Sequence, residues 1–245
     1  MLLTRSDAAP VEIERGDRAG TLLFTCEHAG RAVPERLAGL GLAEADLADH
    51  IGWDPGALPL ARALAARFEA PLVAQPYSRL VIDCNRPRHA TDLAPAEADA
   101  RPVPGNAALA AADLDSRWNE IHRPFHAAVA ERAARATALV SVHSFAPRRR
   151  ADTADRPVHV GVLARRDSPL RARLLAALGA AVAGPVALNA PYEIEDESDY
   201  TIPVHAEPAG LPHVLLEVRN DLIAEAAGVA RLARAIGDAL APEAA

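Results

Sequence analysis

The fold of this chain can be inferred from two stretches: TLLFTCEHAG at residues 21–30 and TALVSVHS at residues 137–144. Each is a short apolar run that ends on a histidine flanked by small or polar residues, a pattern typical of a buried strand with a polar side chain at its end. In a parallel α/β sheet the carboxyl ends of the strands meet at one edge, where such sheets keep their active sites. We therefore expect His28 and His143 to lie close together at that edge.

Further apolar runs alternate with segments of helical periodicity. A third run, VLLEVRND at residues 214–221, carries Glu217 and Arg219 toward the same kind of edge. This alternation indicates a three-layer α/β/α fold with a mostly parallel central sheet. The pattern predicts strands at residues 22–26, 71–75, 79–84, 139–143, 157–163, 186–189 and 213–218. It predicts helices at residues 57–68, 115–135, 168–182 and 221–240, and long loops at residues 85–106 and 190–212.

Composition narrows the class of protein. With 245 residues, 50% of them hydrophobic, the chain can bury a full core, and we expect residues 1–245 to form a single domain. The net charge of −7 argues against binding to nucleic acid or to an anionic membrane surface. We expect a cytoplasmic protein, because the sequence shows no long apolar run, no secretory leader and no disulfide framework. Nothing in the sequence indicates an oligomeric state.

The two strand-end histidines together suggest a metal site, although each alone could be a hydrogen-bonded strand end. A catalytic zinc ion takes three protein ligands and keeps a fourth position for water, so a carboxylate should join His28 and His143. Asp54, in the turn WDPG at residues 53–56, and Glu27 are the candidates. Neighbouring residues of an extended segment point to opposite faces, which favours Asp54 and leaves Glu27 as the alternative or as a residue that orients a ligand. For Asp54 a turn-capping role is the competing interpretation.

Glu217 is the candidate for general base. It lies in a strand that should be buried, where a carboxylate is costly unless it is paired or used. Burial raises the pKa of such a group toward neutrality and a nearby cation lowers it, and a base that activates water needs this balance. The alternative is a structural ion pair with Arg219, which projects to the same side of the strand.

Several arginines could hold an acidic substrate. Arg79 and Arg86 flank the run that ends in Asp83-Cys84-Asn85, and guanidinium groups suit substrate carboxylates. Arg219 could join them in one cluster, and it is the second catalytic candidate beside Glu217. Because the chain contains no lysine, each arginine could equally lie on a solvated surface. Lesser candidates for substrate binding are Ser78, Asn85 and His205.

A pair of histidines four residues apart, His122 and His126, falls in the predicted helix at residues 115–135. Such a pair can bind zinc from one helix face, but the glutamate that follows the first histidine in the usual protease helix is missing. We therefore interpret both as ordinary residues of the helix surface or the edge of the core.

Five ordered blocks resemble the N-formylglutamate amidohydrolase family. They are CEHAG with VP at residues 26–34, WDPGA at 53–57, YSRL with DCNR at 77–86, VHSF at 142–145 and EVRNDLI at 217–223. The resemblance spans most of the chain. It implies a zinc-exopeptidase-like (phosphorylase/hydrolase-like) fold with Zn²⁺ or another divalent metal at the sheet edge. It also implies hydrolysis of N-formyl-L-glutamate to formate and L-glutamate in histidine catabolism.

The resemblance also implies roles for individual residues. His28 and His143 match the histidine positions of the family, Glu217 matches its late strand carboxylate, and its arginines correspond to Arg79, Arg86 and Arg219. The acidic loop PYEIEDESDY at residues 191–200 would repel glutamate, so a different N-acyl compound is an alternative substrate.

Two other functions stay open. Cys26 could act as the nucleophile of an amidase with a nearby histidine, although its place within an apolar strand favours packing. The chain could also be a small-molecule-binding protein that keeps the pocket without catalysis.

Overall fold

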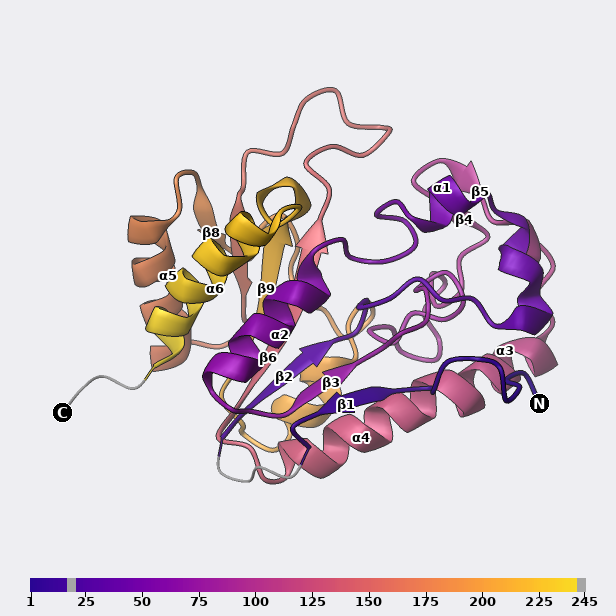
Figure 1. Ribbon diagram of the computed structural model, residues 1–245, viewed down its shortest axis with the longest axis horizontal. Coiled ribbons are helices and arrows are strands. Elements are labelled where there is room, and N and C mark those ends of the chain that lie inside the picture. The colour runs from indigo at the N-terminus through magenta and orange to yellow at the C-terminus, as the bar shows by residue number, and fades with distance from the viewer. Residues whose placement is uncertain (17–20, 242–245) are drawn as a thin grey trace.

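A mixed sheet of seven strands forms the centre of the computed structural model, which describes residues 1–16 and 21–241 (Figure 1). The order of the strands is β1-β3-β2-β6-β9-β7-β8. Their bounds are β1 (Glu12–Glu14), β2 (Leu22–Cys26), β3 (Leu72–Ala74), β6 (Ala138–Phe145), β7 (Val160–Leu163), β8 (Val186–Leu188) and β9 (His213–Arg219). A separate ribbon pairs β4 (Glu97–Ala98) with β5 (Arg101–Pro102) inside the predicted loop at residues 85–106. Residues 17–20 and 242–245, which belong to the predicted domain of residues 1–245, lie outside the described residues.

Four central strands, β3, β2, β6 and β9, run parallel, so their carboxyl ends meet at one edge. β1 and β7 run antiparallel to their neighbours β3 and β9, and β8 is parallel to β7. A parallel return needs a crossover connection, usually a helix, and the described segment between β6 and β7 contains none. It projects beyond the strand ends instead, and β7 returns in the opposite direction (Figure 1). The predicted three-layer fold with a mostly parallel sheet is confirmed.

Helices cover both faces of the sheet (Figure 1). One face packs against α2 (Ala57–Arg67), α5 (Pro169–Ala181) and α6 (Ala226–Leu240). The other face packs against one helical segment made of α3 (Ala111–Arg117), η3 (Trp118–His122) and α4 (Arg123–Ala133). Short helical turns complete the order: η1 (Glu35–Gly41), α1 (Glu44–Leu47), η2 (Pro104–Asn106), η4 (Ile202–Ala206) and η5 (Asn220–Leu222). None of the helices in the described part of the chain has the length and hydropathy that a bilayer crossing requires.

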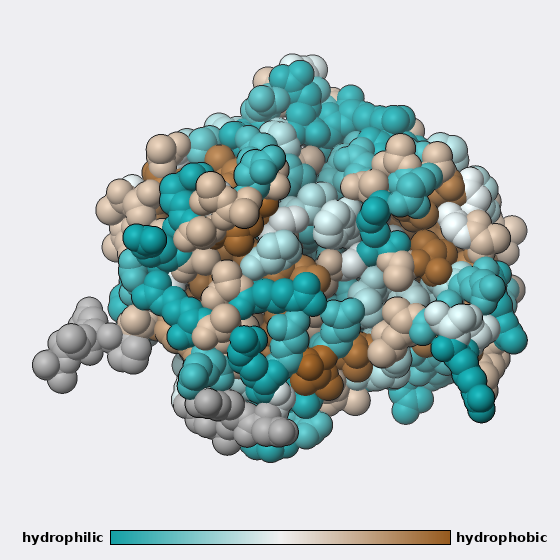
Figure 2. Space-filling model, in the orientation of Figure 1, coloured by the Kyte–Doolittle hydropathy of each residue, from teal (hydrophilic) through white to brown (hydrophobic). Residues whose placement is uncertain are grey.

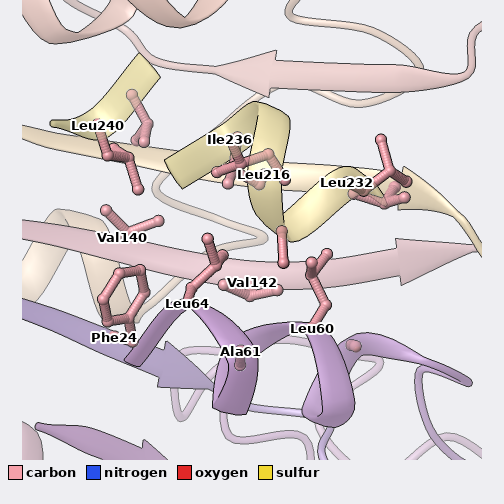
Figure 3. Close-up of a cluster of buried hydrophobic side chains, with 14 of the residues drawn as sticks. Phe24, Leu60, Ala61, Leu64, Val140, Val142, Leu216, Leu232, Ile236 and Leu240 are labelled. Carbon is pink, nitrogen blue, oxygen red and sulfur yellow. The ribbon is translucent and has the colours of Figure 1, made fainter. Parts of the chain in front are cut away.

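The core beneath α2 and α6 is apolar throughout. Figure 3 shows Val140 and Val142 of β6 beside Leu64 of α2 and Ile236 of α6. Burying a side chain of this size contributes about 1.5–3 kcal/mol. Because alternate strand residues point to opposite faces, Ser141 and His143 of the same strand lie on the opposite face.

The strand predicted at residues 79–84 does not form. The segment is buried at Leu80, Val81 and Ile82, but its backbone forms turns and irregular structure. A short apolar run predicts burial and leaves the backbone conformation open. The predicted helix at residues 221–240 begins only at Ala226, after η5.

Candidate active site

Three buried side chains converge at the carboxyl edge of the parallel strands. His28 follows β2, His143 lies in β6, and Asp54 lies in the turn before α2. The Nδ1 atoms of the two histidines are 3.1 Å apart, and Asp54 Oδ2 lies 3.1 Å from Nδ1 of His143 and 3.4 Å from Nδ1 of His28. The arrangement brings together the two histidines and the carboxylate that the sequence favoured.

Backbone contacts hold Asp54 in this place. Its N–H donates to the carbonyl of His28 at 3.0 Å, and the N–H of Ser144 donates to its Oδ2 at 3.1 Å. Gly56 ends the turn with a φ of 83°, and a Cβ at Gly56 would come within 2.6 Å of the carbonyl oxygen of Ile223. Glycine is therefore required where the turn packs against the end of the sheet.

The other ring nitrogen of each histidine contacts a carboxylate. His28 Nε2 lies 2.7 Å from Asp83 Oδ1, and His143 Nε2 lies 3.1 Å from Glu27 Oε2. Burial opposes ionisation of Asp83, but Arg79 holds the pKa of Asp83 well below its usual range. Burial likewise opposes ionisation of Glu27, and hydrogen bonding to His143 nevertheless lowers its pKa to about 2. An ionised carboxylate only accepts hydrogen bonds, so both Nε2 atoms carry hydrogen, and each imidazole in its neutral form presents its lone pair at Nδ1.

The donor set fits a divalent cation. With neutral imidazoles, the lone pairs of His28 Nδ1, His143 Nδ1 and Asp54 Oδ2 face one another, and these groups repel unless a positive charge, a proton or a metal ion, lies among them. Tetrahedral zinc with nitrogen and oxygen ligands places its ligand atoms about 3.3–3.5 Å apart, close to the 3.1–3.4 Å separations here. Among the described residues, His28, Asp54 and His143 form the group of candidate ligands whose atoms all lie within 4.8 Å of one another.

Glu217 lies beside this group. The register of β9 against β6 places Glu217 directly opposite His143. The carboxylate is buried, and its Oε2 has no hydrogen-bond partner in the described structure. Burial raises the pKa of Glu217 to about 7. A carboxylate with this pKa can take up and release a proton near neutral pH.

A cavity of about 950 Å³ opens over these residues. His28, Asp54, His143 and Glu217 line its floor. Arg149 and Arg156 line it from the segment between β6 and β7, which projects at the top of Figure 1. In the same view the top of the molecule is largely hydrophilic (Figure 2). The cavity is therefore suited to a polar small molecule.

Three predicted substrate-binding residues line this cavity: Arg79, Arg86 and Asn85. Arg79 Nη2 lies 2.7 Å from Asp83 Oδ2, and Arg86 Nε lies 2.8 Å from Asp92 Oδ2. Arg86 Nη1 also donates to the carbonyl of Ser198. The structure thus brings both arginines to the cavity with part of each guanidinium already paired.

Asn85 connects the cavity to the acidic loop. Its Nδ2 donates to Asp199 Oδ1 at 2.8 Å, and its Oδ1 accepts from the N–H groups of Tyr200 and Thr201, each at 3.1 Å. The sequence did not indicate these contacts, because the partners are more than a hundred residues away.

Four other candidates lie outside the cavity lining. Both terminal nitrogens and Nε of Arg219 bind Asp221 or the carbonyl of Arg156, so the ion pair with Glu217, which was the alternative to a catalytic role, does not form. Ser78 Oγ donates to the carbonyl of Gly52 at 2.7 Å. His205 contacts His126, and Cys26 is buried in the apolar core. Burial raises the pKa of the Cys26 thiol well above its usual value, so the structure does not support a Cys26 nucleophile.

Sequence reasoning assigned no role to Asp83 or Ser141. Asp83 orients His28, and Ser141 Oγ lies 2.9 Å from both His143 Nε2 and Glu27 Oε2. The available signals were a carboxylate directly after a buried run and a serine two residues before a strand-end histidine. Glu27 lies behind His143, in the orienting position that the sequence left open for it.

Comparisons with known proteins identify the family and the fold. A family model for N-formylglutamate amidohydrolase matches residues 20–224. The gene product Atu2144 from Agrobacterium tumefaciens is 37% identical over 98% of each chain, with a TM-score of 0.90. An N-formylglutamate amidohydrolase from Ralstonia eutropha JMP134 is 20% identical over 95% of this chain and 96% of its own, with a TM-score of 0.69.

More distant likeness concerns the fold alone. A bacteriophage poly-gamma-glutamate hydrolase is 12% identical over 96% of this chain and 90% of its own, with a TM-score of 0.50. No curated protein matches the sequence.

Proposed function

The chain belongs to the N-formylglutamate amidohydrolase family and is a hydrolase of amide bonds, and we propose that it is a metal-dependent deacylase of an N-acyl amino acid. The substrate we propose is N-formyl-L-glutamate, cleaved to formate and L-glutamate, with a related acidic N-acyl amino acid as the alternative. The observation that supports this proposal is the convergence of His28 Nδ1, His143 Nδ1 and Asp54 Oδ2 beside Glu217.

His28, His143 and Asp54 would hold the ion. A divalent metal such as Zn²⁺ supplies Lewis-acid polarisation of the scissile carbonyl and lowers the pKa of a water molecule. Asp83 and Glu27 keep the imidazoles in the tautomer that presents Nδ1 to the ion. These five residues account for binding and orientation.

Glu217 moves the proton in this mechanism. Its carboxylate takes a proton from the attacking water and returns it to the leaving nitrogen, so that the amine departs uncharged. The guanidinium of Arg79 lies at the cavity beside Asp54 and Asp83 and stabilises negative charge on the former carbonyl oxygen. Arg86, at the cavity wall, binds a carboxylate of the substrate.

Metal analysis tests the first half of the proposal. Purified protein should contain roughly one zinc ion per chain, lose activity on chelation and regain it with added zinc. His28→Gln should lose the metal, whereas His213→Gln, at the start of β9 and outside the cavity, should keep it. Full activity of a metal-free protein would contradict the proposal.

A substrate panel tests the second half. N-formyl-L-glutamate should have a higher kcat/KM than N-formyl-L-glutamine, about tenfold or more, because the uncharged amide forfeits a charge-assisted contact with arginine. N-acetyl-L-glutamate in the same panel reports on the acyl group. A zinc-loaded protein that hydrolyses none of these compounds would favour the non-catalytic binding function instead.

A further inference from the structure

The segment at residues 79–86 brings Arg79, Asp83, Asn85 and Arg86 to the cavity without belonging to a strand or a helix. Its buried carbonyl groups therefore need donors from elsewhere in the fold. Asn106 Nδ2 donates to the carbonyl of Leu80 at 2.8 Å. This side-chain donor takes the place of a sheet hydrogen bond that the predicted strand would have made.

The helical segment α3–η3–α4 supplies three more donors. Arg117 Nη1 donates to the carbonyl of Val81 at 2.9 Å. His126 Nε2 donates to the carbonyl of Cys84 at 2.6 Å, and His122 Nε2 donates to the carbonyl of Arg86 at 3.1 Å. The two histidines thus bracket Asn85 by holding the carbonyls on either side of it.

The helix is shaped for this contact. Residues four apart lie on one helix face, and His122 is the last residue of the π-helical turn that follows α3, where the N–H of Arg123 donates to the carbonyl of Trp118. His122 is 1% exposed and stacks on Trp118, with the ring centroids 3.6 Å apart. His126 Nδ1 accepts a hydrogen bond from His205 Nε2 at 2.9 Å. Both rings are therefore fixed in the orientation that directs Nε2 at the segment.

A second connection reaches the same asparagine. The Tyr200 ring packs against His122 and His126, with centroid distances of 4.9 and 4.4 Å. The N–H of Tyr200 donates to Asn85 Oδ1. The histidine pair consequently contacts both the backbone around Asn85 and the loop residue that binds its side chain.

We propose that His122 and His126 are positioning residues, which hold the segment at residues 79–86 so that Asn85 and Arg86 meet the substrate in the cavity. Neither histidine lines the cavity, and they act through the carbonyls of Cys84 and Arg86. The effect on catalysis rests on the proposed function, whereas the holding contacts do not. The histidines thus have a role beyond that of ordinary edge-of-core residues.

Kinetics of matched variants test the catalytic part. His122→Leu and His126→Leu remove the donor, and His122→Gln and His126→Gln retain a donor at a similar reach. His213→Leu is the control, because His213 is also buried and donates from Nδ1 to the carbonyl of Leu211 at 2.8 Å, away from the cavity. We expect the two leucine variants to raise KM about tenfold to a hundredfold with a smaller change in kcat.

The glutamine variants should have KM values within about threefold of the wild-type value, because they keep the donor. The control His213→Leu should lower Tm without changing KM. Equal KM values for the leucine variants, the control and the wild type would overturn the positioning role. A rise in KM of the same size in His213→Leu would overturn it as well, because a general loss of stability would then explain the result.

Hydrogen–deuterium exchange tests the holding contacts without a substrate. The N–H groups of Asn85 and Arg86 bond to Asp83 Oδ1 and to the Asp83 carbonyl. Their exchange should be about tenfold faster in His126→Leu than in His213→Leu. Unchanged exchange would overturn the proposal. If the wild type hydrolyses no compound of the panel while exchange still rises, the proposed function fails and the holding contacts stand.

Discussion

From Val140 to His143, the two faces of β6 carry opposite kinds of side chain. Val140 and Val142 pack into the apolar core with α2 and α6. Ser141 and His143, on the other face, lie among buried ionisable groups that include Glu27 and Glu217. Because strand residues alternate between faces, the same eight residues serve both the core and the candidate active site.

The two faces differ in what they contribute to stability. Burial of apolar area on the first face stabilises the fold. On the second face, burial of the Glu217 carboxylate costs free energy that its contacts only partly offset, because its pKa is raised to about 7 and its Oε2 has no partner in the described structure. The contrast indicates that apolar burial sustains a site that includes one destabilising buried carboxylate, Glu217.

The largest effect is expected from Glu217→Gln on the polar face. We expect kcat to fall about 10²–10⁴-fold, because the amide cannot take up the proton. Metal content should stay unchanged, and the free energy of unfolding at pH 8 should be unchanged or higher, because a buried charge is removed. Steady-state kinetics, metal analysis and urea unfolding measure these quantities. Near-normal turnover with full metal content would remove Glu217 from the mechanism.

On the apolar face, Leu64→Ala should have the opposite signature. Leu64 is fully buried in α2, and its truncation should lower the free energy of unfolding by about 2–5 kcal/mol. Below the unfolding transition, kcat/KM should remain within about twofold of the wild-type value. A parallel loss of activity and stability would show that the two faces are energetically coupled.

A smaller effect is expected from Asp83→Asn, which weakens the orientation of His28. Removal of the charge that faces His28 Nε2 should lower zinc affinity about 10–100-fold. Competition with a chromogenic chelator measures this affinity. Asp92→Asn is the matched control, since Asp92 pairs with Arg86 at the cavity rim and touches neither histidine. Equal affinities for the two variants would contradict the orienting role of Asp83.

The smallest effect concerns the histidines beneath the polar face. Burial lowers the pKa of His122 from 6.5 to about 4, and the charges of His205 and Arg88 act in the same direction. Between these pH values the unfolded chain binds a proton at His122 that the folded chain does not, so the free energy of unfolding falls as the pH falls.

His122→Gln removes this contribution. Between pH 7.5 and pH 5.5, the wild type should lose about 1 kcal/mol more of its free energy of unfolding than the variant does. Urea unfolding at the two pH values measures the difference, and groups common to both proteins, such as Glu217, cancel. Identical losses would show that His122 does not titrate as its burial requires.

Hydrophobic periodicity was sufficient to identify most of the elements. The strand predicted at residues 22–26 is β2, and the helices predicted at residues 57–68 and 168–182 differ from α2 and α5 by only a residue or so at their ends. Strand-end position was also sufficient to place His28 and His143 at one edge. These inferences succeeded because burial of one face makes apolar residues recur at a fixed spacing, and this spacing is visible within a single short segment of sequence.

The direction of β7 and the backbone conformation of residues 79–84 could not be predicted from hydrophobic periodicity. The segment at residues 79–84 has the apolar content of a strand, yet its carbonyls bond to side chains of Asn106, Arg117 and His126. β7 runs antiparallel to β9 because no helix carries the chain back after β6. Both outcomes depend on which segments become neighbours after folding.

Only the tertiary structure determined which groups the polar side chains contact. His28 meets Asp83 across 55 residues, Asn85 meets Asp199 across 114, and Arg219 turns to Asp221 instead of Glu217. An apolar residue is satisfied by any apolar neighbour, so its pattern along the chain is informative. A buried polar atom needs one partner at one distance and angle, and the folded arrangement of distant segments supplies it.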